Sequence, residues 1–396
     1  MVAATVRVTR DLDAAEEIVQ DAYVKALRTW AHDGVPDRPG AWLTTVARRD
    51  ALNLIRRQQT LRAKLPLLVD REDTDMLDTT TDTDSIPDDR LRLIFTCCHP
   101  ALSEEARIAL TLRLVCGVAT PDIAHAFLVA EATMAARLTR AKKKIAAARI
   151  PYAVPSPDEL PARVHAVLTV VHLLYATGHT AHSGDELVRD ELTDRALDLA
   201  HLLRLLLPAD REAMGLLALL LVHHARRATR TDADGRLLRL DEQDRSGWDR
   251  DLIAEADRLV VAALTAGPPG RFTLQAAIAA LHAQAPSYDA TDWPQIRTLY
   301  DELLRIWPSP VVALNRAVAV SMVDGPAAAL AEVEALEREG RLTGYRYLPA
   351  TRADLLHRLG RHAEAADAYR AALALSDNAA EQEFLAERAR SLGPSP

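Results

Sequence analysis

Histidines, cysteines and carboxylates are the side chains that most often bind metals or take part in catalysis, so their spacing comes first. His165, His172 and His179 recur every seven residues, and three further candidate ligands follow: His182, Asp185 and Glu186. Imidazole and carboxylate groups are common metal ligands. On a helix, however, residues seven apart are separated by ~10 Å along the axis, too far for two of them to bind one ion. Core or surface histidines are therefore the better interpretation.

The cysteines and the absence of catalytic motifs also argue against an enzyme. Cys97, Cys98 and Cys116 are an odd number, two are adjacent, and none forms a CxxC pair. They predict neither a disulfide framework nor a metal knuckle, and they suit a reducing cytoplasm. The sequence contains no nucleophile elbow and no phosphate-binding loop. We therefore expect a protein that is not an enzyme and that uses no metal or cofactor.

A basic stretch from residue 40 to residue 59 suggests a different chemistry, contact with nucleic acid. Trp42 lies near its start, and its polar side carries Arg48, Arg49, Asn53, Arg56 and Arg57. Basic side chains bind phosphates, while asparagine and an aromatic ring suit an unstacked base. The alternative is a solvent-exposed charged helix whose Trp42 belongs to the core. Taken alone, this stretch slightly favours the alternative.

A second basic segment has the spacing of a helix-turn-helix. Residues 121–127 predict a short helix, 128–130 a turn, and 131–148 a longer helix whose first residues would enter the major groove. Base edges would be contacted by Thr133, Met134 and Arg137, and phosphates by Arg140, Lys142, Lys143 and Lys144. An ordinary helical hairpin with a solvent-exposed basic face is about equally compatible with this spacing.

The distribution of charge sets these two segments apart from the rest of the chain. The 396 residues carry a net charge of −8, which argues against a free-standing protein that binds DNA by bulk attraction. Residues 1–150 hold 22 basic and 21 acidic side chains, whereas the remainder holds 26 and 35. Residues 38–64 have seven basic side chains and one acid, and residues 70–89 have nine acids and one base. An acidic spacer thus separates the two basic segments.

Composition and periodicity predict an all-α protein. Hydrophobic residues make up 49% of the chain and aromatic residues only 4%, a balance that favours helices over strands. Residues 11–30 predict the first clear helix, capped by Asp13 with Glu16. Its apolar stripe would be Leu12, Ala15, Val19, Ala22, Tyr23, Ala26, Leu27 and Trp30. No apolar run reaches the ~18 residues of a membrane span, and no signal core is expected.

Breaks in these patterns predict five segments. The acidic, aperiodic residues 67–87 predict an extended linker, and four prolines within residues 150–163 mark a second boundary. We therefore expect two small helical domains at 1–66 and 88–150, a helical extension at 151–290 and a repeat domain at 291–396. In the last, Tyr300, Glu334 and Tyr369 align at steps of 34 and 35 residues. A period near ~34 residues is typical of tetratricopeptide repeats, with one helical pair per repeat.

The order of these segments resembles a bacterial sigma factor of the extracytoplasmic-function type, within the sigma-70 family. DLDAAEEIVQDAYVKALRTW resembles its polymerase-clamp helix, and RPGAWLTTVARRDALNLIRR resembles the helix that melts and reads the minus-ten element. LSEEARIALTLRLVCGVATPDIAHAFLVAEATMAARLTRAKKKI resembles the domain that reads the minus-thirty-five element. The remainder resembles the subgroup with a tetratricopeptide-like C-terminal extension. Two departures stand out: the first helix of the polymerase-binding domain is expected to be missing or misassigned at its start, and LLYATGHTAH replaces an LLFNEGY-like stretch.

The resemblance implies roles for particular residues. Core RNA polymerase would be contacted by Glu17, Gln20, Asp21 and Lys25. The minus-ten strand would be bound by Trp42, Arg48, Arg49, Asn53, Arg56 and Arg57, and the minus-thirty-five duplex by Thr133, Met134, Arg137, Arg140 and Lys143. The implied partners are core polymerase, promoter DNA and a regulatory protein on the C-terminal repeats, in the cytoplasm and without a membrane.

The expected function is therefore promoter-specific transcription initiation with a regulatory extension, whose acidity would restrain the basic helices. One alternative is a stand-alone helix-turn-helix regulator with a tetratricopeptide effector domain. Another is a tetratricopeptide scaffold whose basic N-terminal helices contact an acidic partner. The order of a clamp-like helix followed by a Trp-led basic helix favours the sigma factor.

Overall fold

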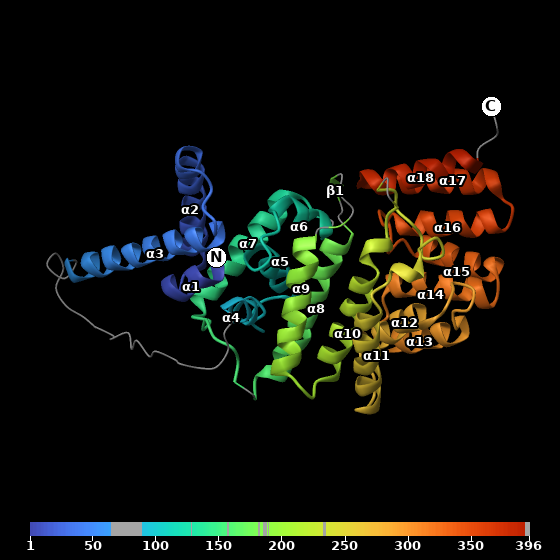
Figure 1. The fold of residues 1–396 in the computed structure, drawn as a ribbon, viewed down its shortest axis with the longest axis horizontal. Coiled ribbons are helices and arrows are strands. Elements are labelled where there is room, and N and C mark those ends of the chain that lie inside the picture. Colours follow the sequence, from blue (N-terminus) through green and yellow to red (C-terminus); the bar gives the residue numbers. More distant parts are fainter. Residues whose placement is uncertain are drawn as a thin grey trace. The chain divides into compact units, whose positions relative to one another are not determined.

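The computed structural model is built of helices, as the sequence predicts, and it divides into two compact units (Figure 1). The structure describes residues 1–64, 89–127, 129–156, 158–180, 183–184, 188, 190–232 and 235–392. Residues 1–170 form the first unit and residues 171–396 the second. The whole of the predicted linker at 67–87 therefore lies outside the described residues. None of the helices described is long and apolar enough to span a membrane.

The first unit contains seven helices among its described residues and the start of an eighth. They are α1 (Val2–Thr9), α2 (Leu12–Asp33), α3 (Pro39–Lys64), α4 (Asp89–Cys97), α5 (Glu104–Leu114), α6 (Thr120–Ala126), α7 (Glu131–Ala147) and α8 (Leu160–His179). The division between the units falls within α8.

The second unit contains the remaining helices and a two-residue parallel strand pair. The helices are α9 (Asp190–Leu206), α10 (Arg211–Ala225), α11 (Arg250–Thr265), α12 (Arg271–Gln284), α13 (Trp293–Ile306), α14 (Pro310–Val323), α15 (Pro326–Glu339), α16 (Tyr347–Arg358), α17 (His362–Leu373) and α18 (Ala379–Leu392). The strands are β1 (Ser183–Gly184) and β2 (Asp377–Asn378).

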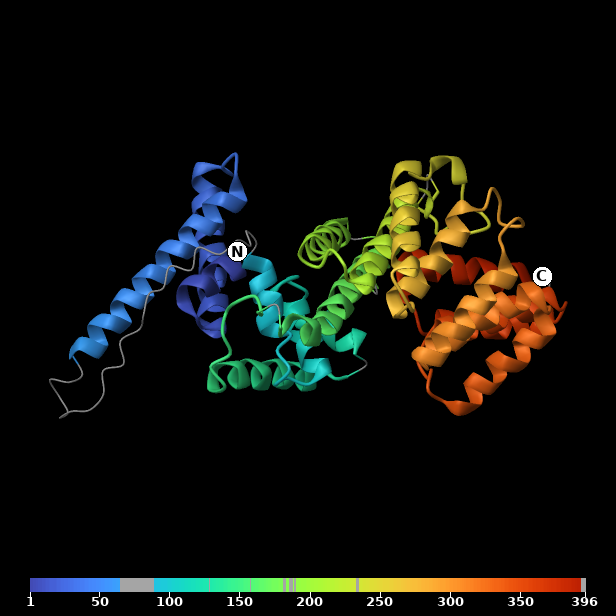
Figure 2. The same cartoon turned by 90° about the horizontal axis from the view of Figure 1, so that it is seen from below.

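Helices α1, α2 and α3 pack together around a small apolar core. Ile18, Val19 and Ala22 of α2 meet Leu43 and Ala47 of α3. Helix α1 was not predicted, since the sequence analysis placed the first clear helix at residues 11–30. Its sequence VAATVRVT is rich in β-branched residues, which have modest helix propensity, and packing of its buried face outweighs that preference. The second half of α3 extends past α1 and α2 (Figures 1 and 2).

Two predictions for α2 need correction. Its N-cap is Asp11, whose carboxylate accepts hydrogen bonds from the backbone N–H groups of Asp13 and Ala14; Asp13 is inside the helix. Tyr23 and Leu27, assigned to the apolar stripe, are 52% and 74% exposed. The stripe is narrower than predicted because α2 is covered mainly along one side, by α1 and α3.

The rest of the first unit is built from α4 to α7. The three cysteines lie here; all are buried, and none is in a disulfide. After α7, Tyr152 is buried, and its hydroxyl donates to the carbonyl oxygens of Ala3 and Asp89. One phenol thereby joins α1 to the start of α4.

Helix α10 is the centre of the second unit and is buried along almost its whole length. Gly215 lies so close to α12 that an added Cβ would come within 2.5 Å of the Thr273 nitrogen. Glu212 caps α12, because its carboxylate accepts hydrogen bonds from the N–H groups of Phe272 and Thr273. Any larger residue at position 215 would force α10 away from this cap.

The six last helices form three consecutive pairs, α13/α14, α15/α16 and α17/α18, each helix packed on the next (Figures 1 and 2). Gly325 and Gly360 separate the pairs with φ values of 93° and 74°, a backbone conformation that favours glycine. The predicted break near residue 290 is not a structural one, since α12 and α13 share a core containing Ile278 and Ile296.

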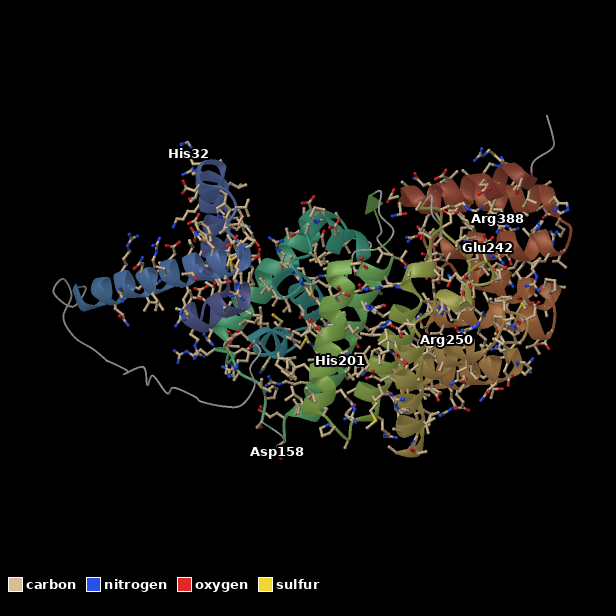
Figure 3. The ribbon with its side chains drawn as sticks, in the orientation of Figure 1. His32, Asp158, His201, Glu242, Arg250 and Arg388 are labelled. Carbon is tan, nitrogen blue, oxygen red and sulfur yellow. The ribbon has the colours of Figure 1, made fainter. Side chains whose placement is uncertain are left out.

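Ion pairs connect the segment between α10 and α11, residues 226–249, to the repeats. Arg388 of α18 contacts Glu242 at 2.8 Å (Figure 3), and Arg239 contacts Asp354 of α16 at 2.7 Å. The predicted extension and repeats are therefore parts of one compact unit.

Candidate nucleic-acid interface

Helix α3 presents its predicted DNA-contacting residues to solvent. Leu43, Ala47 and Ala51, each four residues apart, are buried against α1 and α2. The opposite side is therefore exposed, and it carries all five polar residues singled out from the sequence: Arg48, Arg49, Asn53, Arg56 and Arg57. Four guanidinium groups along one helix face form a surface suited to a polyanionic backbone.

Trp42 was considered either as a core residue or as a ring for an unstacked base, and its burial is intermediate between the two. Its ring lies 5.4 Å from that of Trp30, centroid to centroid and tilted by 60°, and it packs against the α2–α3 core. The side chain is half-buried rather than fully enclosed. Trp42 thus supports the core and still offers one edge at the start of the basic face.

Helices α6 and α7 form the predicted helix-turn-helix, and their packing corrects one assignment. Helix α6 packs against α7, and Ile123 and Ala124 of α6 are buried, as are Met134 and Leu138 of α7. Met134 is 0% exposed, so it belongs to the core of the motif and cannot contact a base edge. Its position is dictated by the spacing of Met134, Leu138, Ala141 and Ile145, which places all of them on the buried side of α7.

The other predicted residues of α7 differ in accessibility. Thr133, Arg140 and Lys143 are exposed. Arg137 is half-buried, and its guanidinium lies 5.7 Å from the ring of Phe127, a cation–π distance. Arg137 is therefore held against the turn before α7, near the N-terminal end expected to meet the groove.

Lys142 was assigned to phosphate contacts, but the structure shows it paired within the protein. Its ammonium lies 2.6 Å from an oxygen of Asp13 and 2.8 Å from one of Glu16, both on α2. Burial alone would lower the pKa of Lys142, but the hydrogen bonds that its ammonium donates to the carboxylates of Asp13 and Glu16 outweigh burial and raise it. Arg113 of α5 also reaches Glu16, at 3.3 Å. Glu16 thus joins the first helical bundle to the helix-turn-helix.

The solvent side of α2 carries the predicted polymerase contacts and an apolar patch that the sequence analysis missed. Glu17, Gln20 and Asp21 are exposed. Lys25 is exposed too, but it pairs with Asp50 of α3 at 2.6 Å and is less available than predicted. Three apolar residues of the same helix are exposed as well, Tyr23, Val24 and Leu27, and Val35, just after the end of α2, is also exposed. The presence of four apolar residues within thirteen positions could have indicated this exposed surface. It was overlooked because two of them, Tyr23 and Leu27, fit the apolar stripe of α2.

The histidines do not assemble a metal site in the part of the chain that the structure describes. His165 is exposed, whereas His172 and His179 are half-buried in the second unit. His182 and the nearby acids Asp185 and Glu186 lie outside the described residues. The ring of His179 lies 5.2 Å from that of His223 on α10. The described residues of the first unit thus present exposed arginine and lysine side chains on α3 and α7 and exposed apolar side chains on α2.

Comparison with known proteins agrees with this geometry. Residues 2–60 match the family described as Sigma-70 region 2, and residues 92–145 match Sigma-70, region 4. Residues 163–264 match a family of unknown function, DUF6596. An uncharacterized protein of Rhizobium meliloti (strain 1021) is 44% identical over 99% of this chain and 93% of its own length. The chain therefore belongs to the sigma-70 family, in its extracytoplasmic-function group, and carries a C-terminal extension.

Proposed function

We propose that this protein brings core RNA polymerase to a specific set of promoters and helps to open them. The observation that carries the proposal is the pair of exposed basic surfaces on α3 and α7, each within a segment that matches a sigma-70 region. The chain performs no covalent chemistry in this role. Its partners are core polymerase and promoter DNA, which places it in the cytoplasm.

The proposed division of labour follows from the exposed residues. Thr133, Arg137, Arg140 and Lys143 of α7 bind the minus-thirty-five duplex, with Arg140 and Lys143 on phosphates. Arg48, Arg49, Asn53, Arg56 and Arg57 of α3 hold the minus-ten strand, and Trp42 supplies an aromatic edge for an unstacked base. Cations along α3 stabilise the melted strand because they bind its phosphates without needing paired bases.

The proposed polymerase surface is the exposed side of α2. It combines the polar residues Glu17, Gln20 and Asp21 with the apolar patch of Tyr23, Val24, Leu27 and Val35. An apolar patch with a polar rim is typical of protein–protein interfaces. Polymerase contributes much of the DNA affinity in such a complex, which explains why a chain of net charge −8 can act at promoters.

Run-off transcription tests the proposal. The protein, core polymerase and the DNA upstream of its own gene should together produce a discrete start that neither protein produces alone. Arg56→Ala with Arg57→Ala should reduce this product at least about tenfold, since two phosphate contacts are lost. The control removes two exposed arginines of the second unit, Arg258 and Arg338, and should leave the product unchanged.

Two other outcomes would replace the proposal. Tight binding to duplex DNA with no effect of polymerase would indicate a stand-alone helix-turn-helix regulator. Neither transcription nor DNA binding would indicate a scaffold.

We also propose that the second unit regulates the first, through a protein partner on the repeats or through its own acidity. Support comes from its compactness and from the acidic surplus beyond residue 150. The same transcription assay with residues 1–170 alone tests this role. Equal activity and equal salt dependence with and without the second unit would rule it out.

A further inference from the structure

The second unit contains a cavity whose chemistry is unlike that of an ordinary core. We infer that this cavity binds a small organic carboxylate with an apolar body. It has a volume of about 320 Å³ and is bounded by side chains of α8, α10, α12, α13 and α14 together with Arg226 just after α10. We call it the inner cavity; its polar residues are His172, His223, Arg226, Gln275, His282 and Asn315. This inference does not depend on the proposed role at promoters.

The charge inside the inner cavity is positive. Arg226 is largely enclosed, and no aspartate or glutamate is among the described residues that line the cavity. Its guanidinium lies over Trp248, 5.2 Å from the ring centroid, and its Nε has no hydrogen-bond partner among the described residues. Burial, together with Arg230 and Arg245, lowers the pKa of Arg226 to about 10, so it remains charged at neutral pH. A buried cation without an acid partner is costly, and an anionic ligand would offset that cost.

The histidines of the inner cavity supply neutral hydrogen-bonding groups. Burial lowers the pKa of His172 and His282 to about 4 and that of His223 to about 3. The Nδ1 atoms of His172 and His282 are buried without a hydrogen-bond partner among the described residues. Buried polar atoms without partners are rare in folded proteins and need an explanation. One fixed positive charge beside neutral donors suits a singly charged carboxylate better than a doubly charged phosphate.

The inner cavity adjoins a larger pocket, with which it shares lining residues and which suits the body of such a ligand. This outer pocket has a volume of about 630 Å³ and shares His282, Tyr300 and Asn315 with the inner cavity. Its charged side chains are largely neutralised, since Arg239 lies between Asp241 and Asp354 at 3.1 Å and 2.7 Å. Its walls include Trp293, Met322 and Phe384. Apolar and aromatic walls around a few polar groups are typical of small-molecule sites.

Binding of simple probes to the full chain tests this inference. Benzoate and octanoate should bind at millimolar concentration or below, detected by ligand-observed NMR and calorimetry. The matched amides, benzamide and octanamide, should bind at least about tenfold more weakly, because they lose a charge-assisted hydrogen bond to Arg226. Failure of both carboxylates to bind at millimolar concentration, or equal binding of the amides, would overturn the inference. Tighter binding of phenyl phosphate than of both carboxylates would overturn the choice of carboxylate.

Matched variants locate the site. Arg226→Gln should weaken carboxylate binding about tenfold or more, whereas the same change at the neighbouring Arg227, which is exposed and pairs with Asp194, should not. Asn315 is exposed at the junction of the two spaces, so Asn315→Asp should fold and should repel the ligand. Gln295→Glu, an exposed site on α13 away from both spaces, adds the same charge as a control. Unchanged binding in both folded cavity variants would contradict the inference, and if Arg226→Gln fails to fold, Asn315→Asp alone decides.

Discussion

At the scale of single residues, two neighbours in the sequence that were both predicted to contact DNA differ in their burial. Thr133 is exposed at the start of α7, whereas the next residue, Met134, is completely buried beneath it. A helix turns by 100° per residue, so one position decides whether a side chain supports the motif or touches its target.

We expect substitution of a buried residue of α7 to lower stability and substitution of an exposed cation of α7 to weaken DNA binding. Met134→Ala should cost about 2–5 kcal/mol of stability by leaving a cavity in the helix-turn-helix core. Hydrogen exchange of the α7 amides would measure this loss.

The contrasting variant is Arg140→Ala, at an exposed position. It should change stability by less than about 0.5 kcal/mol, yet should weaken promoter binding and lower its salt dependence by about one unit. A stable Met134→Ala protein with impaired base recognition would contradict the assignment of this residue to the core.

At the scale of elements, ion pairs of very different burial connect the helices of the first unit. Lys142 and Glu16 join α7 to α2 with side chains only 16% and 18% exposed. Lys25 and Asp50 join α2 to α3, but Lys25 is 48% exposed. Desolvated pairs couple more strongly than exposed ones, because water screens the latter.

A double-mutant cycle should reveal this difference. The coupling between Lys142 and Glu16 should be roughly 1–3 kcal/mol, against about 0.2–1 kcal/mol for Lys25 and Asp50. Both cycles use alanine variants and denaturant unfolding of the same chain. Equal coupling in the two cycles would show that the α2–α7 contact contributes nothing beyond an ordinary surface pair.

At the scale of the whole molecule, the buried histidines should make the second unit sensitive to acid. The folded state keeps His172, His223 and His282 neutral down to a pH of about 4, whereas the unfolded chain protonates them near pH 6.5. Their contribution is therefore complete above pH 6.5 and is lost as the pH falls toward 4.

Between pH 7 and pH 5 the second unit should lose about 2 kcal/mol for each of these histidines. In a chain with Trp30→Phe and Trp42→Phe, denaturant unfolding followed by the fluorescence of Trp248, Trp293 and Trp307 reports on this unit. His223→Gln removes one titrating group and should flatten the pH dependence without abolishing it. A stability independent of pH over this range would contradict the buried, neutral state of the cluster.

The sequence alone was enough to predict the helical class, the two helices of the helix-turn-helix and the two basic segments. These features depend on local periodicity and on runs of like charge, and both patterns can be recognised within the length of one helix. The helix-turn-helix and the exposed row from Arg48 to Arg57 were therefore predictable.

The tertiary structure was needed to show which side chains are exposed and which are covered by a neighbouring helix. Met134 is buried, Lys142 is paired with α2, and Tyr23 and Leu27 are exposed, because each outcome depends on which neighbouring helix covers that side. The inner cavity was likewise invisible in the sequence. His172, Arg226 and Asn315 are far apart along the chain, and packing of helices from distant segments brings them together.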